Sequence, residues 1–175
     1  MRYKVIPGPA DEDLLYAVSD AVPLVPGSVE DCCTRIRDRT SLASREEARE
    51  WLTFCQALGL VAETDRGYHR VRDPPEGEVL ATAFEENVLG AREVLDAFDT
   101  ADGPLDVAGA FEAVSDVVPR WERSRDPDWE VEWRGRVRRL LEWGVVFGHL
   151  ERTANGTDPL ADRVTYSPLP DTGRR

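Results

Sequence analysis

Residues 57–71 read ALGLVAETDRGYHRV, and this stretch decides the fold. A helical pattern ends at Gly59, a residue type that suits the left-handed position just after a helix. Two short runs with strand character, residues 60–64 and 68–71, lie on either side of Asp65-Arg66-Gly67, a turn-forming cluster. The sequence therefore predicts a helix that passes directly into a small β-hairpin.

The helix before Gly59 has a clear start and a clear apolar face. Ser44 and Glu47 form a capping-box pattern, in which each side chain accepts from the other residue's amide. Apolar residues then recur at helical spacing: Ala48, Trp51, Leu52, Cys55 and Leu58. Two further helices are predicted before this one, at residues 11–21 and 28–39.

A cluster of three helices leaves one side of its shared core open. A hairpin that leaves the last helix can fold back over that side and bury its own apolar residues there. We expect the covering residues to be Leu60, Val61 and Val71, and the hairpin tip at Asp65-Arg66-Gly67 to remain in water.

The same order of elements returns after Pro74-Pro75-Glu76-Gly77, which reads as a domain boundary. Its first helix is opened by a Thr82–Glu85 capping box, and its last begins at Asp126-Pro127. Three helices are predicted there, at residues 82–98, 106–118 and 126–143.

Gly144 is expected to play the part of Gly59 in this second half. A second ribbon follows it, with strands in VVFGHLERT and ADRVTYS and a turn at Asn155-Gly156. We therefore predict an internal duplication, with one module in residues 1–75 and the other in residues 76–175.

Each half resembles the winged helix-turn-helix family. The resemblance is carried first by Ser28–Arg39, the capped helix Ser44–Leu58 and the Asp65-Arg66-Gly67 turn, and then by Asp106–Arg123, Pro127–Trp143 and the Asn155-Gly156 wing. It implies a mostly α fold with small β-ribbons, a tandem winged helix with three helices and a two-stranded wing in each unit. In this family the third helix usually reads the major groove of DNA, and the wing contacts the DNA backbone.

The charge of the chain fits a salt-loving organism. The net charge is -12, from 34 acidic and 22 basic residues, and Lys4 is the only lysine. Acid excess with lysine loss resembles the composition of haloarchaeal proteins. Carboxylates keep a chain hydrated, and in ~1 M salt their repulsion is screened beyond about 3 Å. We therefore interpret most of the charge as adaptation to the high salt in which halophilic archaeal proteins work.

The basic residues nevertheless gather in one place. Residues 120–139 hold seven arginines and five acids, whereas residues 76–116 hold eleven acids and one arginine. For a DNA-binding transcription regulator, we expect the main contact with double-stranded DNA from Arg134, Arg136, Arg138 and Arg139. A weaker second contact is expected from Arg45, Arg49, Arg66 and Arg70.

Two alternatives stay open. The arginines of the second unit can instead form intrahelical pairs with Glu130, Glu132 and Glu142 on a solvated face. The acidic 76–116 face can instead bind a protein partner. The chain then resembles the acidic tandem winged-helix adaptors of archaeal transcription initiation and chromosome segregation.

Catalysis, metal binding and membrane insertion find no support in the sequence. We find no Walker loop, no GxSxG and no HExxH, and the three cysteines form no CxxC, so we expect a non-enzymatic protein without cofactor or metal. No apolar run reaches ~18 residues and no signal core is present, which predicts a cytoplasmic protein. His69 and His149 are expected half-exposed on ribbon strands, and Trp121 in the core.

Overall fold

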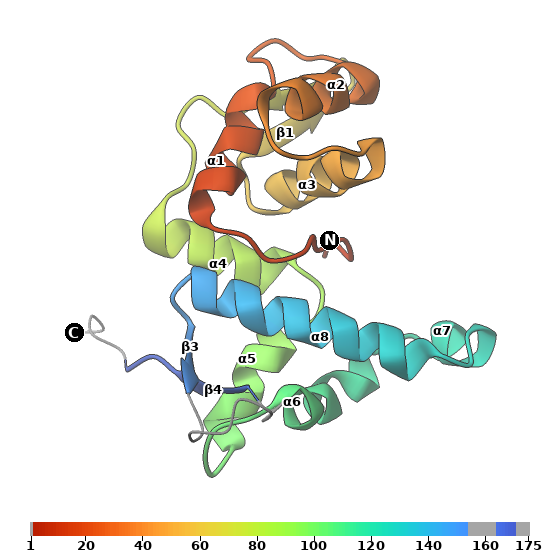
Figure 1. Cartoon of the computed structure of the whole chain (residues 1–175), viewed down its shortest axis with the longest axis vertical. Coiled ribbons are helices and arrows are strands. Elements are labelled where there is room, and N and C mark those ends of the chain that lie inside the picture. Colours follow the sequence, from red (N-terminus) through yellow and green to blue (C-terminus); the bar gives the residue numbers. More distant parts are fainter. Residues whose placement is uncertain (1, 154–163, 171–175) are drawn as a thin grey trace. The chain divides into compact units, whose positions relative to one another are not determined.

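The chain forms two compact units, Met1–Leu89 and Gly90–Arg175 (Figure 1). The computed structural model describes residues 2–153 and 164–170. The predicted turn at Asn155-Gly156 lies outside the described residues. Each unit contains helices and one two-stranded antiparallel sheet, so the predicted tandem winged-helix architecture is confirmed.

The first unit begins with the three predicted helices, each with a side-chain cap. They are α1 (Glu12–Ala21), α2 (Val29–Arg39) and α3 (Arg45–Ala57), and their N-cap residues are Asp11, Ser28 and Ser44. The capping box at Ser44 and Glu47 is present, as predicted. The ribbon follows as β1 (Val61–Thr64) and β2 (Gly67–Arg70).

This ribbon closes the core of the first unit. Leu60 and Val61 are buried against the helical trio, whereas Asp65 and Arg66 at the tip are exposed. Complete burial of one aliphatic side chain contributes about 1.5–3 kcal/mol, so the ribbon adds to stability as well as to shape. The apolar interior that it covers includes Leu15, Val18, Ile36, Leu52, Phe54 and Leu58.

Helix α4 (Gly77–Asn87) lies in the first compact unit, although the predicted module boundary falls at residues 75 and 76. Two hydrogen bonds tie its end to that unit: the Asn87 side chain donates to Ala57 O (2.9 Å), and the Tyr3 amide donates to Asn87 O (2.7 Å). The predicted start at a Thr82–Glu85 capping box is wrong, because the helix already begins at Gly77.

The predicted single helix over residues 82–98 is also two helices. Val88 at the C-cap of α4 is extended, and Gly90, with φ +90°, stands at the N-cap of α5 (Ala91–Thr100), so the helical path is broken between them. A left-handed residue cannot continue a right-handed helix, and glycine takes that conformation at little cost. The continuous apolar spacing across residues 82–98 therefore hid a real break.

The second unit continues with α6, a short 3₁₀ turn, α7 and α8. Their bounds are α6 (Val107–Val114), η1 (Ser115–Val117), α7 (Arg120–Arg125) and α8 (Trp129–Val146). In Figure 1, α8 lies across α5 and α6, and it packs against both. The predicted start at Asp126-Pro127 is wrong, because Asp126 ends α7 and Asp128 precedes α8.

The second ribbon, β3 (Leu150–Thr153) and β4 (Thr165–Pro168), does not begin at Gly144 as predicted. Helix α8 runs through Gly144, which is buried. A Cβ built on Gly144 would lie 3.1 Å from the Leu150 side chain. The left-handed glycine is Gly148, with φ +77°, and it matches Gly59, with φ +79°. Gly148 is therefore the counterpart of Gly59.

Backbone hydrogen bonds show the same junction twice. In the first unit, the amides of Leu58, Gly59 and Leu60 donate to carbonyls four, three and five residues back, over 3.1, 3.1 and 2.9 Å. In the second, Phe147, Gly148 and His149 repeat these separations over 2.9, 3.1 and 2.8 Å. This is a Schellman closure of the helix, and it aims both ribbons in the same way.

A short bridge on the return strand completes the repeat. Gly27 and Tyr68 exchange two amide–carbonyl bonds of 2.9 Å, and Leu105 and Tyr166 do the same over 3.0 and 2.8 Å. The residue after each bridge, Ser28 or Asp106, caps the next helix. These shared landmarks assign equivalent residues in the two units by counting from the bridges and from the two glycines.

Val71, predicted to cover the core with Leu60 and Val61, is only half-buried. Cys32, Cys33 and Cys55 are buried, and the two histidines are half-buried on or beside the ribbons. The prediction that Trp121 is a core residue is wrong, because its side chain is 62% exposed on α7. Within residues 2–153 and 164–170, no helix has both the length and the apolar character needed to cross a bilayer.

Candidate nucleic-acid interface

The exposed side of α8 forms one wall of a groove in the second unit. Residues one turn apart face it: Val131, Arg134, Gly135, Arg138 and Glu142. The start of α6 and the ribbon residues Val164 and Tyr166 form the rest of the lining. The groove holds about 710 Å³ and is open to solvent. The groove lining thus combines apolar residues and two arginines with the acids Asp106 and Glu142.

Arg134 and Arg138 supply the positive charge of this face. Both side chains are exposed, and the Arg134 guanidinium lies 5.3 Å from the Phe111 ring centroid. In the part of the chain that the structure describes, neither arginine forms a salt bridge. Of the predicted intrahelical pairs with Glu130, Glu132 and Glu142, the last is not formed as a salt bridge: Glu142 pairs with Arg152 of the ribbon, while the charge of nearby Arg138 still acts on its carboxyl.

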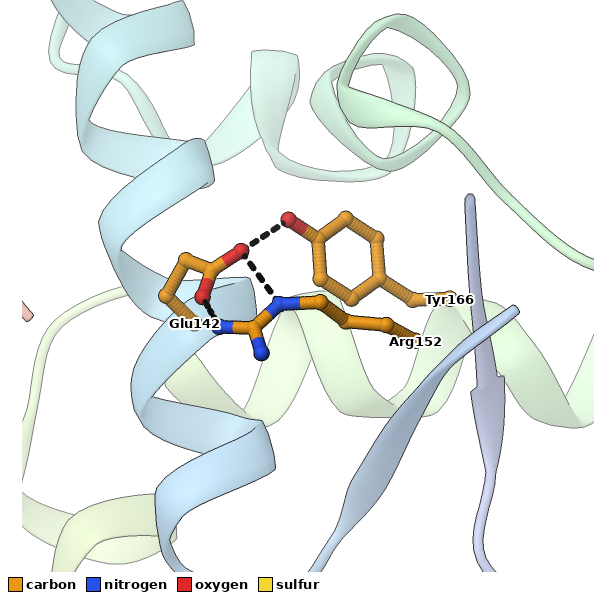
Figure 2. Close-up of polar contacts among 3 residues, drawn as sticks. All are labelled: Glu142, Arg152 and Tyr166. Carbon is orange, nitrogen blue, oxygen red and sulfur yellow. Dashed lines mark hydrogen bonds and ion pairs between the residues drawn. The ribbon is translucent and has the colours of Figure 1, made fainter. Parts of the chain in front are cut away.

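Glu142 is held by the ribbon (Figure 2). Tyr166 Oη donates to Glu142 Oε1 over 2.5 Å, Arg152 Nε donates to the same oxygen over 3.1 Å, and a second Arg152 nitrogen donates to Oε2. Burial alone would raise the pKa of the Glu142 carboxyl, but the bonds from Arg152 and Tyr166, together with the nearby charge of Arg138, hold that pKa below its ordinary value. Burial and the Glu142 carboxylate raise the pKa of Tyr166.

Arg136 lies elsewhere, although it belongs to the same helix. Its side chain is only 8% exposed, and its guanidinium lies 5.4 Å from the Trp133 ring centroid. Trp133 Nε1 in turn donates to the buried Glu122 of α7 over 2.9 Å. Burial, and the nearby charge of Arg139, lower the pKa of Arg136 to about 10. Arg136 therefore stays charged at neutral pH, buried beside Trp133 and close enough to Glu122 of α7 to feel its charge.

The equivalent face of α3 in the first unit is less open. Arg45, which lies as far before Gly59 as Arg134 lies before Gly148, pairs with Glu30 over 2.5 Å. The cleft beside this pair holds about 170 Å³. Arg49, the equivalent of Arg138, is exposed. An acid on α2 thus binds the first arginine of this face.

The two wing arginines of the first unit differ from each other. Arg66 is exposed at the ribbon tip. Arg70 is half-buried and pairs with Asp20 at the end of α1 over 3.1 Å. The structure therefore brings Arg134 and Arg138 together on one face, with exposed Arg139 at its flank, and leaves Arg136 and Arg70 outside any exposed basic face.

The model of a halobacterial double winged helix domain matches residues 1–163. The chain belongs to this family. No curated protein and no solved structure matches it.

The sequence predictions missed three residues that shape the double winged helix's open face. Ala108 and Gly135 stand where the first unit has Glu30 and Glu46, so the second unit lacks two acids at its groove. Arg152 compensates the charge of a third acid, Glu142, by pairing with it. A comparison of the two halves in the correct register would have found the first two, but the prediction placed the ribbon at Gly144 and lost that register.

Proposed function

We propose that the protein is a DNA-binding transcription regulator that contacts double-stranded DNA through the exposed face of α8. One observation carries the proposal: Arg134 and Arg138 stand exposed beside an open groove, whereas the equivalent Arg45 is paired with Glu30. Exposed arginines at helical spacing suit the phosphates and guanine edges of a major groove.

The apolar part of the face suits a protein that works in high salt. DNA affinity falls with salt with a log–log slope of about -0.9 per phosphate neutralised, so charge alone gives little in molar salt. Val131, at the start of α8, is 72% exposed and can contact base edges. Gly135, one turn further, has no side chain to hold a partner away from the helix.

Gly135 has no role in packing within the described structure. A Cβ built on it meets nothing within 4 Å. Glycine inside a helix costs about 1 kcal/mol relative to alanine, and here no internal contact offsets that cost. We attribute the presence of a glycine at this position to close approach of a partner to the helix backbone.

The other predicted arginines take graded roles in this proposal. Arg139 is exposed beside the main face and contacts flanking phosphate. Arg49 and Arg66 of the first unit are exposed and make the weaker second contact. Arg45 and Arg70 already pair with Glu30 and Asp20 of their own unit, and Arg136 is buried beside Trp133, so these three contribute least to the contact.

The test is a DNA-binding measurement on genomic fragments in high potassium chloride. The wild type is expected to retain DNA, and Arg134→Glu/Arg138→Glu is expected to lose at least about a hundredfold in affinity, since two attractive phosphate contacts become repulsive. Arg49→Glu and Arg138→Glu form a matched pair at equivalent positions, and the loss should be larger for Arg138. Arg35→Glu, on the exposed side of α2, makes the same charge change away from these faces.

A second candidate is a protein–protein adaptor. The segment 76–116 favours it, because that segment holds eleven acids and one arginine, and in the second unit exposed Asp96, Asp99 and Glu112 keep the surface of α5 and α6 acidic. Such a surface repels phosphate and suits a basic protein partner. If the wild type retains no DNA, the regulator is excluded and the adaptor becomes the better account.

A further inference from the structure

Glu142 lies one helical turn after Arg138 on the proposed DNA-binding face. A carboxylate there has two effects that oppose DNA binding. It repels phosphate directly, and it can pair with Arg138, because residues four apart on a helix are neighbours. The open face of α8 therefore depends on where this carboxylate points.

The ribbon occupies both oxygens of Glu142. Oε1 accepts from Tyr166 Oη (2.5 Å) and from Arg152 Nε (3.1 Å), and Oε2 accepts from a terminal nitrogen of Arg152. Figure 2 shows the carboxylate drawn toward β3 and β4, with the two ribbon side chains converging on it. The Glu142 side chain is 15% exposed, whereas the Arg152 side chain is 55% exposed. The acid is thus neutralised and turned toward the ribbon.

The strand positions of both partners are fixed by the backbone. Arg152 and Tyr166 face each other in the β3–β4 register, and Tyr166 is held by its two bonds to Leu105. Their side chains are therefore presented to α8 from a rigid pair of strands. The ribbon is a support for the helix face as well as a wing.

We propose that Arg152 and Tyr166 are positioning residues that hold the Glu142 carboxylate on the ribbon, so that it forms no salt bridge with Arg138 and the charge of Arg138 stays available to DNA phosphate. This inference rests on the proposed function. Neither residue needs to touch DNA for the effect, because both act through Glu142.

The first unit supports this assignment by contrast. At the position equivalent to Glu142 it has Thr53, whose hydroxyl donates to Arg49 O of its own helix (3.0 Å). At the position equivalent to Arg152 it has Glu63, which faces Tyr68 in the β1–β2 register. At these two equivalent positions the first unit therefore has neither the acid nor the arginine. The acid and the arginine that neutralises it occur together in the second unit.

The experiment is a double-mutant cycle on the full chain, with affinity for a retained genomic fragment measured in potassium chloride of several concentrations. Arg152→Gln is expected to weaken binding about tenfold and to lower the salt slope by about 1, since Arg138 then pairs with Glu142 and gives up one phosphate. Glu142→Gln alone should bind as well as the wild type or better. The double variant should return to within about twofold of Glu142→Gln.

Tyr166→Phe gives a second route to the same question. It removes one hydrogen bond to Glu142 and keeps the buried ring, so the ribbon stays folded. We expect a loss of about twofold to threefold that Glu142→Gln also restores. Arg138→Gln should abolish the effect of Arg152→Gln, because the two changes act on the same phosphate contact.

The outcomes separate cleanly. Equal weakness of Arg152→Gln and of the double variant shows that Arg152 contacts DNA itself, which overturns the inference. Wild-type affinity in both Arg152→Gln and Tyr166→Phe overturns it too. Failure of the wild type to bind any fragment is a different result, and it rejects the proposed function. Restored binding by Glu142→Gln in both backgrounds supports the positioning role.

Discussion

The exposed faces of α3 and α8 share the same backbone geometry but differ in their side chains and in what those side chains contact. Both helices end in the same Schellman closure, and both ribbons pair with a bridge before the second helix of the unit. On α3, however, Arg45 is bound to Glu30, whereas on α8 the equivalent Arg134 faces a groove beside Ala108. The scaffold is therefore fixed by backbone hydrogen bonds and buried apolar residues, and a few exposed positions decide what each unit can bind.

The two ribbons show the same separation of scaffold and surface. A tyrosine, Tyr68 or Tyr166, occupies the bridge position in each ribbon, where backbone hydrogen bonds form the bridge. The residue opposite it is Glu63 in one ribbon and Arg152 in the other. The charge that the ribbon presents to the helix is thus reversed between units, without any change in strand register.

The largest effect is expected where the two ribbons differ in backbone conformation. Gly67 has φ +122°, and a Cβ there would lie 2.2 Å from Gly27 O, which is itself bonded to Tyr68. Gly67→Ala should therefore destabilise the first unit by more than about 3 kcal/mol in a denaturant titration. The equivalent residue is Thr165, and Thr165→Ala should cost only about 1 kcal/mol, for its bonds to Thr153. Equal losses would contradict this difference between the two ribbons.

The next effect comes from giving the second unit the acids of the first. Ala108→Glu/Gly135→Glu places carboxylates where Glu30 and Glu46 stand in the first unit, and Arg134 then has a partner on α6. We expect DNA affinity to fall by about tenfold to a hundredfold, while the unfolding midpoint stays close to that of the wild type.

The matched control for this exchange is the reverse change in the first unit. Glu30→Ala releases Arg45 and should raise affinity or the salt slope slightly. Unchanged DNA binding by the Ala108→Glu/Gly135→Glu variant would mean that the groove is not part of the interface.

Sequence patterns predicted the scaffold well because the scaffold depends on local signals. The Ser44–Glu47 capping box, the left-handed Gly59 and the apolar face of α3 each follow from a few neighbouring residues, and each is present. Gly144 misled the prediction because two glycines, Gly144 and Gly148, precede plausible strands. Only the packing of Leu150 over Gly144 shows which of them lies inside the helix.

The candidate site was harder to predict because it depends on contacts between distant segments. Arg136 shares a helix with Arg134, and only the position of α7, with Glu122 and Trp133, shows that Arg136 is buried. Likewise, the pairing of Glu142 with Arg152 requires the ribbon register. Helical periodicity identifies which residues share a face, but it does not identify what covers that face.

A smaller and more even effect is expected at the two left-handed glycines. Gly59→Ala and Gly148→Ala each force a Cβ into a left-handed conformation, and neither Cβ meets an atom closer than 3.7 Å. Each change should therefore cost about 1–2 kcal/mol from backbone strain alone, and the two costs should agree within about 0.5 kcal/mol. Because the sites lie in different units, the double variant should be additive. A clear inequality between the single variants, measured by denaturant unfolding, would contradict the equivalence of the two junctions.

The smallest effect distinguishes the ribbons by their response to acid. The pKa of Glu142 is held below its ordinary value in the folded chain, so its contribution to stability is complete above about pH 4.3 and is lost as the pH falls through the folded-state pKa. Wild type should therefore exceed Glu142→Gln in unfolding free energy by less than about 1 kcal/mol at pH 7, and the difference should vanish on acidification. Thr53→Val, at the equivalent position of the first unit, should give a difference that does not vary with pH, because threonine does not titrate. If the difference in unfolding free energy for Glu142→Gln is equally independent of pH, the bonds from Arg152 and Tyr166 do not stabilise the carboxylate. The two ribbons then differ only in surface charge.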